Sequence, residues 1–380
     1  MSAPSAASTA AKATDTGAGT TPATAVGTSA PAHSVPPNRR MAAVIVLIPL
    51  VAALALWAFA WPNARTAPRD LPLGVAGPAT AVTQVEKQLA HREGAFEIHR
   101  YADETAAREA IEDRTVYGAV VVTQAGPKLL TASAASPMVA QLLQQAVTQQ
   151  AAEEGVRVAI TDVVATSPND PRGAAFGAGV LPLALAGTAS GAMVTLLGLR
   201  RGRAAGALVG AAVLVGLAAT AITESWLGVL GGHWWAEAGV LSLTTLAVGG
   251  TVAGFASLLG KPGMGLGALL IVFVGNPFAG AATAPQLLPE PAGALGRLLP
   301  PGAGVSLLRS VSFFDGAAAL APALVLTAWA AFGLTAVLLG HLLRRAPKPA
   351  ERTATEPAPA PVPAGSVAVR SAGFGARLSR

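Results

Sequence analysis

Residues 41–61 read MAAVIVLIPLVAALALWAFAW, a run of 21 residues without a charge. A helix rises about 1.5 Å per residue, so a run of this length crosses the ~30 Å hydrocarbon core of a bilayer. Trp57 and Trp61 lie near its C-terminal end, and aromatic rings of this kind favour the membrane interface. The run therefore predicts a transmembrane helix over residues 41–61.

This first apolar run also admits a second interpretation, a cleaved signal peptide. Ala58-Phe59-Ala60 fits the small-x-small pattern of a cleavage site. However, the run exceeds the ~7–15 apolar residues of a signal peptide, and the tail before it is far longer than a usual n-region. We therefore expect an uncleaved anchor. The tail, residues 1–38, is rich in Ala, Thr, Ser, Gly and Pro and is predicted to be disordered.

Five further apolar segments lie C-terminal to Pro171, and their interiors hold no Asp, Glu, Lys or Arg. The whole chain is 52% hydrophobic and 12% charged, with a mean hydropathy of +0.52. These features predict an α-helical polytopic membrane protein with six transmembrane helices, whose main partner is the lipid bilayer. The five-helix part spans 174–343, with helices over about 174–199, 204–223, 236–259, 263–283 and 321–343.

Residues 62–172 differ from the rest, because they carry 10 Lys and Arg and 13 Asp and Glu. Alternating and β-branched runs predict strands, and segments with helical spacing lie between them. The order βαβαββαβ predicts an α/β domain with a mixed sheet, inserted between the first and second transmembrane helices. Asp103 and Ser136-Pro137 are typical helix starts. The predicted elements are Leu71–Gly77, Ala79–His91, Phe96–Tyr101, 103–114, Tyr117–Thr123, Leu129–Ala134, 136–154 and Val156–Val164.

Positive charges beside the apolar segments predict the orientation of the chain. They are Arg39 and Arg40, then Arg200, Arg201 and Arg203, then Lys261, and finally Arg344, Arg345 and Lys348. With a cytoplasmic N-terminus, every basic short loop falls in the cytoplasm, as the positive-inside rule requires. We therefore expect a multi-pass protein of the cell membrane with both termini inside. The α/β domain and the stretch 284–320 are then extracytoplasmic, and the Pro- and Ala-rich tail 344–380 is a disordered cytoplasmic segment.

The sequence carries no recognisable catalytic or metal-binding motif. It has no cysteines, none of its five lysines is followed by Ser or Thr as in a Walker A loop, and its five histidines lack metal-ligand spacing. We therefore expect no enzyme activity, no cofactor and no metal site. The net charge of +6 does not indicate nucleic acid binding, because the positive residues lie beside apolar segments.

Three titratable residues lie at the ends of the apolar segments, namely Glu224, Glu237 and His341. We interpret them as solvated at the membrane interface, since a proton relay requires ionisable groups at depth. Any transport by this chain is then expected to take its energy from a partner. The motifs Gly187-x3-Gly191 and Gly206-x3-Gly210 permit close helix contact, although neither can be assigned to a dimer interface from the sequence.

The stretch 284–320 is the most distinctive part of the chain. Residues 285–316 read PQLLPEPAGALGRLLPPGAGVSLLRSVSFFDG, and their five prolines prevent one continuous helix. Two short amphipathic pieces are predicted. One has Leu295, Leu298 and Leu299 on its apolar face, and the other has Val305, Leu308 and Val311. They either lie in or dip into the outer interface, or form an ordered loop that caps the bundle; the sequence leaves both open.

The arrangement resembles ABC-2-type permeases, and more closely the actinobacterial membrane proteins of the YhgE/Pip-like branch. Leu71–Pro78 (LPLGVAGP), followed by Tyr101–Val122 with its YGAVVV run, resembles the start of the external domain of these permeases. Asn276-Pro277 through Gly316, with LLPPGAG and LLRSVSFFDG, resembles the element before their last span. The resemblance covers about 70–343. It implies a permease half that forms a homodimer and couples to a separate ATP-binding-cassette ATPase.

Two functions are therefore expected for such a chain. The first is an export-type permease subunit that moves an amphipathic or hydrophobic substrate. The second is a non-transporting scaffold or receptor whose external α/β domain binds an envelope partner, because the region before Met41 lacks a clear coupling helix. The candidate functional residues lie in the proline-rich element and are Pro300, Pro301, Arg309 and Asp315. The simpler interpretation is that Arg309 and Asp315 are solvated at the outer interface.

Overall fold

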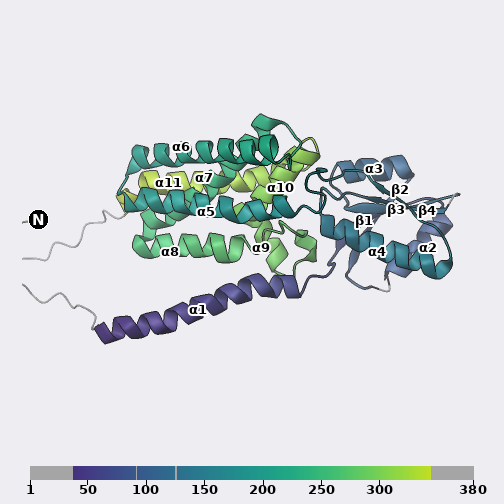
Figure 1. Cartoon of the computed structure of the whole chain (residues 1–380), viewed down its shortest axis with the longest axis horizontal. Helices are drawn as coiled ribbons and strands as arrows, with labels where there is room; N and C mark the ends of the chain where they lie inside the picture. The colour runs from purple at the N-terminus through teal and green to yellow at the C-terminus, as the bar shows by residue number, and fades with distance from the viewer. Residues whose placement is uncertain (1–36, 91, 125, 344–380) are drawn as a thin grey trace, which may run out of the picture. The chain divides into compact units, whose positions relative to one another are not determined.

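The computed structural model describes residues 37–90, 92–124 and 126–343 (Figure 1). The tails predicted over 1–38 and 344–380 lie outside this range, apart from residues 37 and 38, and so do the basic residues that follow the last helix. The first element is helix α1, Pro37–Ala64. The chain divides into two units within α1, one ending at Ala53 and the other beginning at Leu54, and the second unit contains every element after α1.

The described residues include five helices that are long and apolar enough to cross a membrane. The prediction of a multi-pass, mainly helical membrane protein with a small α/β region is confirmed at this level by length and composition. The five segments are Val44–Ala64, Ala174–Leu196, Arg201–Trp226, Trp234–Leu259 and Leu320–Gly340.

The helix predicted over residues 263–283 is shorter than expected. Helix α8, Lys261–Leu269, continues as a π-helix, Leu270–Gly275, and the helical structure ends there. The prediction was wrong beyond Gly275, because Pro277 has no N–H to donate to a helix and Gly280 adopts a left-handed backbone with φ of +63°. The apolar helix Lys261–Gly275 is therefore shorter than the ~20 residues that usually cross a bilayer.

Helix α7, Trp234–Leu259, is the centre of the helical bundle. Helices α5 (Ala174–Leu196), α6 (Arg201–Thr220), α8 and α11 (Leu320–Leu343) all pack against it, and they run alongside one another in Figure 1. In its apolar segment 67% of the residues are buried, compared with 22% in α5 and 33% in α11. Helix α7 therefore supplies the core that the surrounding helices cover.

Glycine decides which helices of the bundle approach most closely. The motif Gly187-x3-Gly191 faces α7, and a Cβ atom on Gly191 would lie only 2.4 Å from the carbonyl oxygen of Gly249. The second motif behaves differently, because a Cβ atom on Gly206 or Gly210 would meet nothing within 4 Å. The first motif is therefore an internal α5–α7 contact, whereas the second makes no contact within the described chain.

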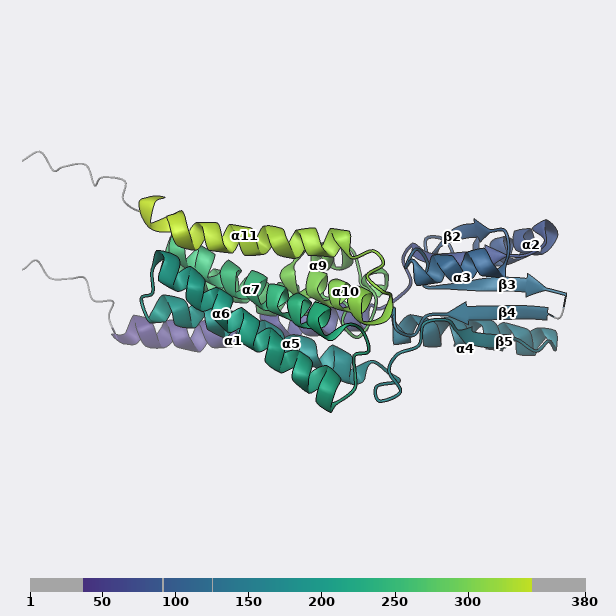
Figure 2. The same cartoon turned by 90° about the horizontal axis from the view of Figure 1, so that it is seen from above.

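The α/β region has the element order that the sequence predicts. Its sheet runs β2-β1-β3-β4-β5. Strand β1 is parallel to β2 and β3, β3 is antiparallel to β4, and β4 is parallel to β5, so the sheet is mixed (Figure 2). The bounds are β1 Leu71–Ala76, α2 Ala79–Ala90, β2 Phe96–Tyr101, α3 Glu104–Glu112, β3 Gly118–Thr123, β4 Gly126–Thr131, α4 Pro137–Glu154 and β5 Ala159–Asp162.

Helices cover both faces of this sheet. On one face Ile111 of α3 packs with Val121 and Leu130 of the strands. On the other face Leu143 of α4 packs with Leu73, and α2 lies on the same side. Burial on both faces explains why the β3 run is continuously apolar rather than alternating.

Both hydrophobic cores of the α/β region include residues from the far end of the chain. Phe314 belongs to the core on the α3 side, and Ala284 and Leu287 belong to the core on the α4 side. Backbone hydrogen bonds add to this contact, since the N–H of Ala67 donates to Leu287 O at 3.1 Å and the N–H of Arg69 donates to Gln286 O at 3.0 Å. The α/β region is therefore completed by residues of the proline-rich stretch.

Candidate functional site

The proline-rich stretch folds into two short helices that turn back along the bundle. They are α9, Ala292–Leu298, and α10, Pro300–Phe313. Pro300 and Pro301 occupy the first positions of α10, where the missing N–H of proline has no intrahelical partner to lose, and both are buried. Ala303 and Leu307 of α10 share a core with residues of α7 and α11.

The turn between α9 and α10 lies beside the middle of α11. The indole Nε1 of Trp329 donates to the carbonyl oxygen of Leu298 at 2.8 Å. Trp329 is nine residues from the start of α11 at Leu320, which corresponds to about 14 Å along the helix. Helices α9 and α10, which we call the re-entrant pair, therefore pack against the bundle helices α7 and α11. Their position relative to the membrane interface stays a prediction.

The apolar face predicted for the first piece is not the face that packs. Leu295 and Leu298 are 43% and 60% exposed, and only Leu299 of that set is buried. Helix α9 instead buries small residues, because a Cβ atom on Gly296 would lie 1.8 Å from the carbonyl oxygen of Phe278. Close approach of two backbones overrode the amphipathic pattern.

Arg309 is the only one of the two charged candidate residues that is buried, with 5% of its surface exposed. Its guanidinium donates to the carbonyl oxygens of Gly280 and Ala281 at 3.2 and 2.5 Å. It also lies over the ring of Phe176, with 5.0 Å between Cζ and the ring centroid. The interpretation of Arg309 as a solvated interface residue is therefore wrong. The side chain instead joins α10 to α5 and to the segment after α8.

Asp315 lies just beyond α10 and is exposed, so its interpretation as a solvated residue agrees with its place in the fold. Its backbone has a φ of +49°, which turns the chain out of α10. Asp315 and Arg309 do not meet in an ion pair. Of the four predicted candidates, the structure therefore brings Pro300, Pro301 and Arg309 into the packed re-entrant pair and leaves Asp315 outside it.

Two residues of the α/β region complete this site. The guanidinium of Arg114 donates to the carbonyl oxygen of Ser306 in α10 at 3.0 Å and lies 5.2 Å from the ring centroid of Phe314. The hydroxyl of Tyr117 donates to Gln286 Oε1 at 2.8 Å. These contacts tie the α3–β3 connection to α10 and to the segment before α9.

The charges in this junction are mostly positive. Burial raises the pKa of the Tyr117 hydroxyl, and the positive charges of Arg114 and Arg309 oppose that shift. Burial also lowers the pKa of Arg114. The hydrogen-bond acceptors named above are carbonyl and amide oxygens, so the arginines are held by neutral partners rather than by carboxylates.

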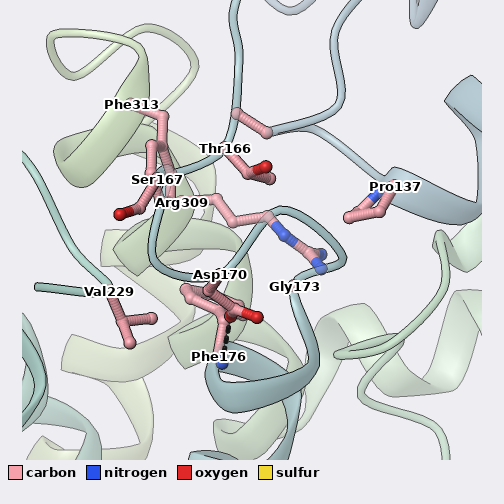
Figure 3. Close-up of a pocket in the computed structure, with 10 residues that line it drawn as sticks. Pro137, Thr166, Ser167, Asp170, Gly173, Phe176, Val229, Arg309 and Phe313 are labelled. Carbon is pink, nitrogen blue, oxygen red and sulfur yellow. Dashed lines mark hydrogen bonds between the residues drawn. The ribbon is translucent and has the colours of Figure 1, made fainter. Parts of the chain in front are cut away.

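A small pocket lies between Arg309 and the start of α5 (Figure 3). Asp170 borders it, and the carboxylate accepts from the N–H groups of Ala175 and Phe176 at 3.1 and 2.8 Å, which stabilises the first turn of α5. The cavity volume is only about 10 Å³, room for roughly one water molecule. A second, apolar pocket between α5, α7 and α10 has a volume of about 30 Å³. Both volumes are far below the ~300 Å³ at which typical ligand pockets begin.

The arrangement ties α10 to the α/β region and to the segment after the π-helix Leu270–Gly275 through two arginine side chains. No group of three metal-ligating side chains occurs among the described residues. Sequence reasoning missed Arg114, Tyr117 and Gln286, because each looks like an ordinary end of a strand, helix or loop. The sequence did offer one signal for these contacts. Arg114 and Tyr117 lie just before the buried strand β3, where the α/β fold by itself requires no polar side chain.

Glu224 and Glu237 also differ from their predicted setting. Glu237 lies in the first turn of α7 and is 0% exposed, so the interpretation that it is solvated is wrong. Glu224 is half-buried in the π-helix Ala221–Trp226 that extends α6. The side chain of His341 lies outside the described residues.

Comparison of this chain with models of protein families, with curated proteins and with solved structures found no match. The class of protein is defined by the fold alone. The apolar helices and the five-stranded sheet make it a multi-pass helical membrane protein with an inserted α/β region.

Proposed function

We propose that the chain is the membrane subunit of an ABC-2-type exporter, which moves an amphipathic or hydrophobic substrate with a separate ATPase. The observation that carries this proposal is the re-entrant pair α9–α10, which packs beside α7 and α11 and is hydrogen-bonded to the α/β region. It corresponds to the proline-broken element expected before the last span of such permeases.

The proposed topology has six spans in the cell membrane and both termini in the cytoplasm. The short helix Lys261–Gly275 would be the fifth span. Arg200 and Lys261 are exposed in the connections α5–α6 and α7–α8. At the other end of α6, Ser167 donates to the carbonyl oxygen of Gly228, close to the α/β region. Basic residues at one end and the α/β region at the other support an extracytoplasmic α/β domain. A tag near Gly126 that reported cytoplasm would contradict it.

The proposed mechanism needs two copies of the chain. The two pockets described above have volumes of only about 10 and 30 Å³, which supports a substrate path between copies. A change in the packing of α7 would reach the α/β domain through α10, because Arg114 and Arg309 bind α10 to its neighbours. The external domain would then open or close the outer end of the path.

Copurification tests the proposal directly. The tagged full chain, extracted in a mild detergent, is expected to retain an ATP-binding-cassette ATPase, and the pair reconstituted in liposomes is expected to export a fluorescent amphipathic probe only with ATP. A chain that elutes alone and forms no ATP-dependent efflux would overturn the exporter proposal.

The alternative is a scaffold or receptor, and the small volumes of the two pockets described above favour it. Deletion of residues 70–170 does not separate the two functions, because it would uncover Phe314 and Leu287. A better test reverses a charge on the exposed edge strand β2, for instance Glu97→Lys. Loss of an envelope partner with ATP-dependent efflux unchanged would assign partner binding to this surface, and loss with no efflux in the wild type would favour the scaffold.

A further inference from the structure

Two carboxyl groups meet where α6 ends and α7 begins. The carboxyl groups of Glu224 and Glu237 are neighbours and interact with each other. Oε1 of Glu237 accepts from the backbone N–H of Gly232 at 3.0 Å. On each residue the remaining oxygen, Oε2, is buried and has no donor among the described residues. Among the residues that the structure describes, the pair therefore lacks the positive partner that two adjacent carboxylates require.

The surroundings of the pair are closed on the side of α10. A Cβ atom on Gly232 would lie 3.0 Å from Glu237 Oε1 and 2.7 Å from the Cα atom of Ser312. Ser312 is buried as well, and its hydroxyl oxygen also finds no partner among the described residues. Three unpartnered polar atoms thus lie at the same junction of α6, α7 and α10.

In the described part of the chain, no neighbouring charge neutralises the two carboxyl groups. Just before α7, His233 is exposed, and just beyond α10, Asp315 is exposed. The guanidinium of Arg309 is held by Gly280 and Ala281, and Asp170 is held by the first turn of α5. The charge that acts on Glu224 is that of Glu237.

We propose that Glu224 and Glu237 form a binding site for one exchangeable proton, which the two carboxyl groups share. Two carboxylates in contact and away from water repel each other, and a hydrogen bond between them needs a proton on one of the two. Glu224 lies in a π-helical turn, a widened turn that often places side chains at functional sites. Being half-buried, it gives the proton a route to the solvent, whereas Glu237 is enclosed.

This inference stands apart from the exporter proposal, because it needs neither an ATPase nor a second copy. A proton site would make the packing of this junction depend on the pH of the compartment that faces the α6–α7 connection. Loss of the proton would leave two negative charges in contact, and their repulsion would loosen the packing of the Gly232 loop against α10.

The test uses dicyclohexylcarbodiimide, an apolar reagent that reacts with protonated carboxyl groups, on the full chain in liposomes. We expect one adduct per chain, mapped by mass spectrometry to Glu224 or Glu237. Labelling is expected to fall about tenfold per pH unit above the midpoint of the titration. Glu290, an exposed carboxylate of the proline-rich stretch, is the internal control and is expected to stay unlabelled.

Single substitutions distinguish labelling of the Glu224–Glu237 pair from labelling of other carboxyl groups. Glu224→Gln and Glu237→Gln are each expected to abolish labelling, because either amide donates to the remaining carboxylate and removes the need for a shared proton. Glu290→Gln is expected to label like the wild type. If Glu237→Gln fails to fold, Glu224→Gln alone decides, since its side chain is only half-buried.

Three outcomes would overturn the proposal. The first is labelling that persists in Glu224→Gln, and the second is labelling of Glu290 to the same extent as the pair. The third is protection of the pair by sodium at constant ionic strength, which would indicate a monovalent-cation site instead of a proton site.

Discussion

The hydroxyl of Tyr117 donates to Gln286 Oε1 at 2.8 Å across 169 positions of sequence. Tyr117 precedes strand β3, and Gln286 lies in the segment between α8 and α9. The bond lies next to the backbone hydrogen bonds of Ala67 and Arg69 with the same segment. The α/β region and the re-entrant pair are therefore joined by a specific polar contact as well as by a shared core.

Removal of this contact is expected to weaken the chain modestly. Tyr117→Phe deletes the hydroxyl and keeps the ring, so we expect a loss of about 1 kcal/mol in the free energy of unfolding. Thermal unfolding followed by tryptophan fluorescence measures it. In a double-mutant cycle with Gln286→Ala the second change is expected to add little. Fully additive effects would mean that the two side chains do not interact.

Loss of the Arg309 guanidinium is expected to cost more. Arg309→Met keeps the length of the side chain but leaves the carbonyl oxygens of Gly280 and Ala281 without a donor. We expect a destabilisation of roughly 2–4 kcal/mol, since each unpaired buried acceptor carries its own penalty. Asp315→Asn is the control, because this exposed residue is expected to change stability by less than about 0.5 kcal/mol. Equal effects of the two substitutions would contradict the buried role of Arg309.

The two glycine motifs are expected to respond with opposite signs to the same substitution. Gly191→Ala places a methyl group against the backbone of α7, so we expect a destabilisation of about 1–3 kcal/mol. Gly206→Ala meets no atom within 4 Å and is expected to stabilise α6 by up to about 1 kcal/mol, because alanine favours the helix. The midpoint of thermal unfolding, measured for both variants in detergent solution, checks this prediction. A stabilising Gly191→Ala would show that α5 and α7 are further apart.

The two tyrosines are expected to ionise at a higher pH than free tyrosine, because both side chains are partly buried. Burial raises the pKa of both Tyr101 and Tyr117, so each folded side chain holds its proton above the ordinary pKa of about 10. The resulting stabilisation is present below the unfolded pKa and is lost as pH rises toward the folded pKa. Tyrosinate absorbance is therefore expected to appear later than in free tyrosine.

The variant Tyr117→Phe serves as the control for this titration. The chain has only 2 tyrosines, so the remaining signal belongs to Tyr101. We expect half the absorbance change, still delayed beyond the ordinary pKa. Ionisation of either tyrosine at the pH of a free tyrosine, while tryptophan fluorescence reports a folded chain, would contradict the burial described above.

Local signals were sufficient to predict the α/β region. Asp103 accepts from the N–H of Ala106 at 2.9 Å, and Ser136 accepts from the N–H of Val139 at 3.3 Å, as expected of helix caps. The YGAVVV run forms β3, buried on both faces. Such features depend on neighbours within a few residues, so the sequence displays them directly.

The proline-rich stretch could be predicted only in part. Its division into two helices followed from the prolines, and Pro300 and Pro301 begin α10 as their chemistry favours. The packing face of α9 could not be predicted, because a pattern of leucines indicates where apolar surface is, not where two backbones meet. Gly296 decided that contact.

By itself, the sequence determined that the chain has apolar helices long enough to cross a bilayer and that a charged α/β region interrupts them. Both follow from hydropathy and spacing, which are local properties of the chain. Only the tertiary structure decided that Arg309 is buried, that Tyr117 reaches Gln286 and that Glu224 meets Glu237. Whether a charge is solvated depends on which distant segments pack around it, and that information is spread over the whole fold.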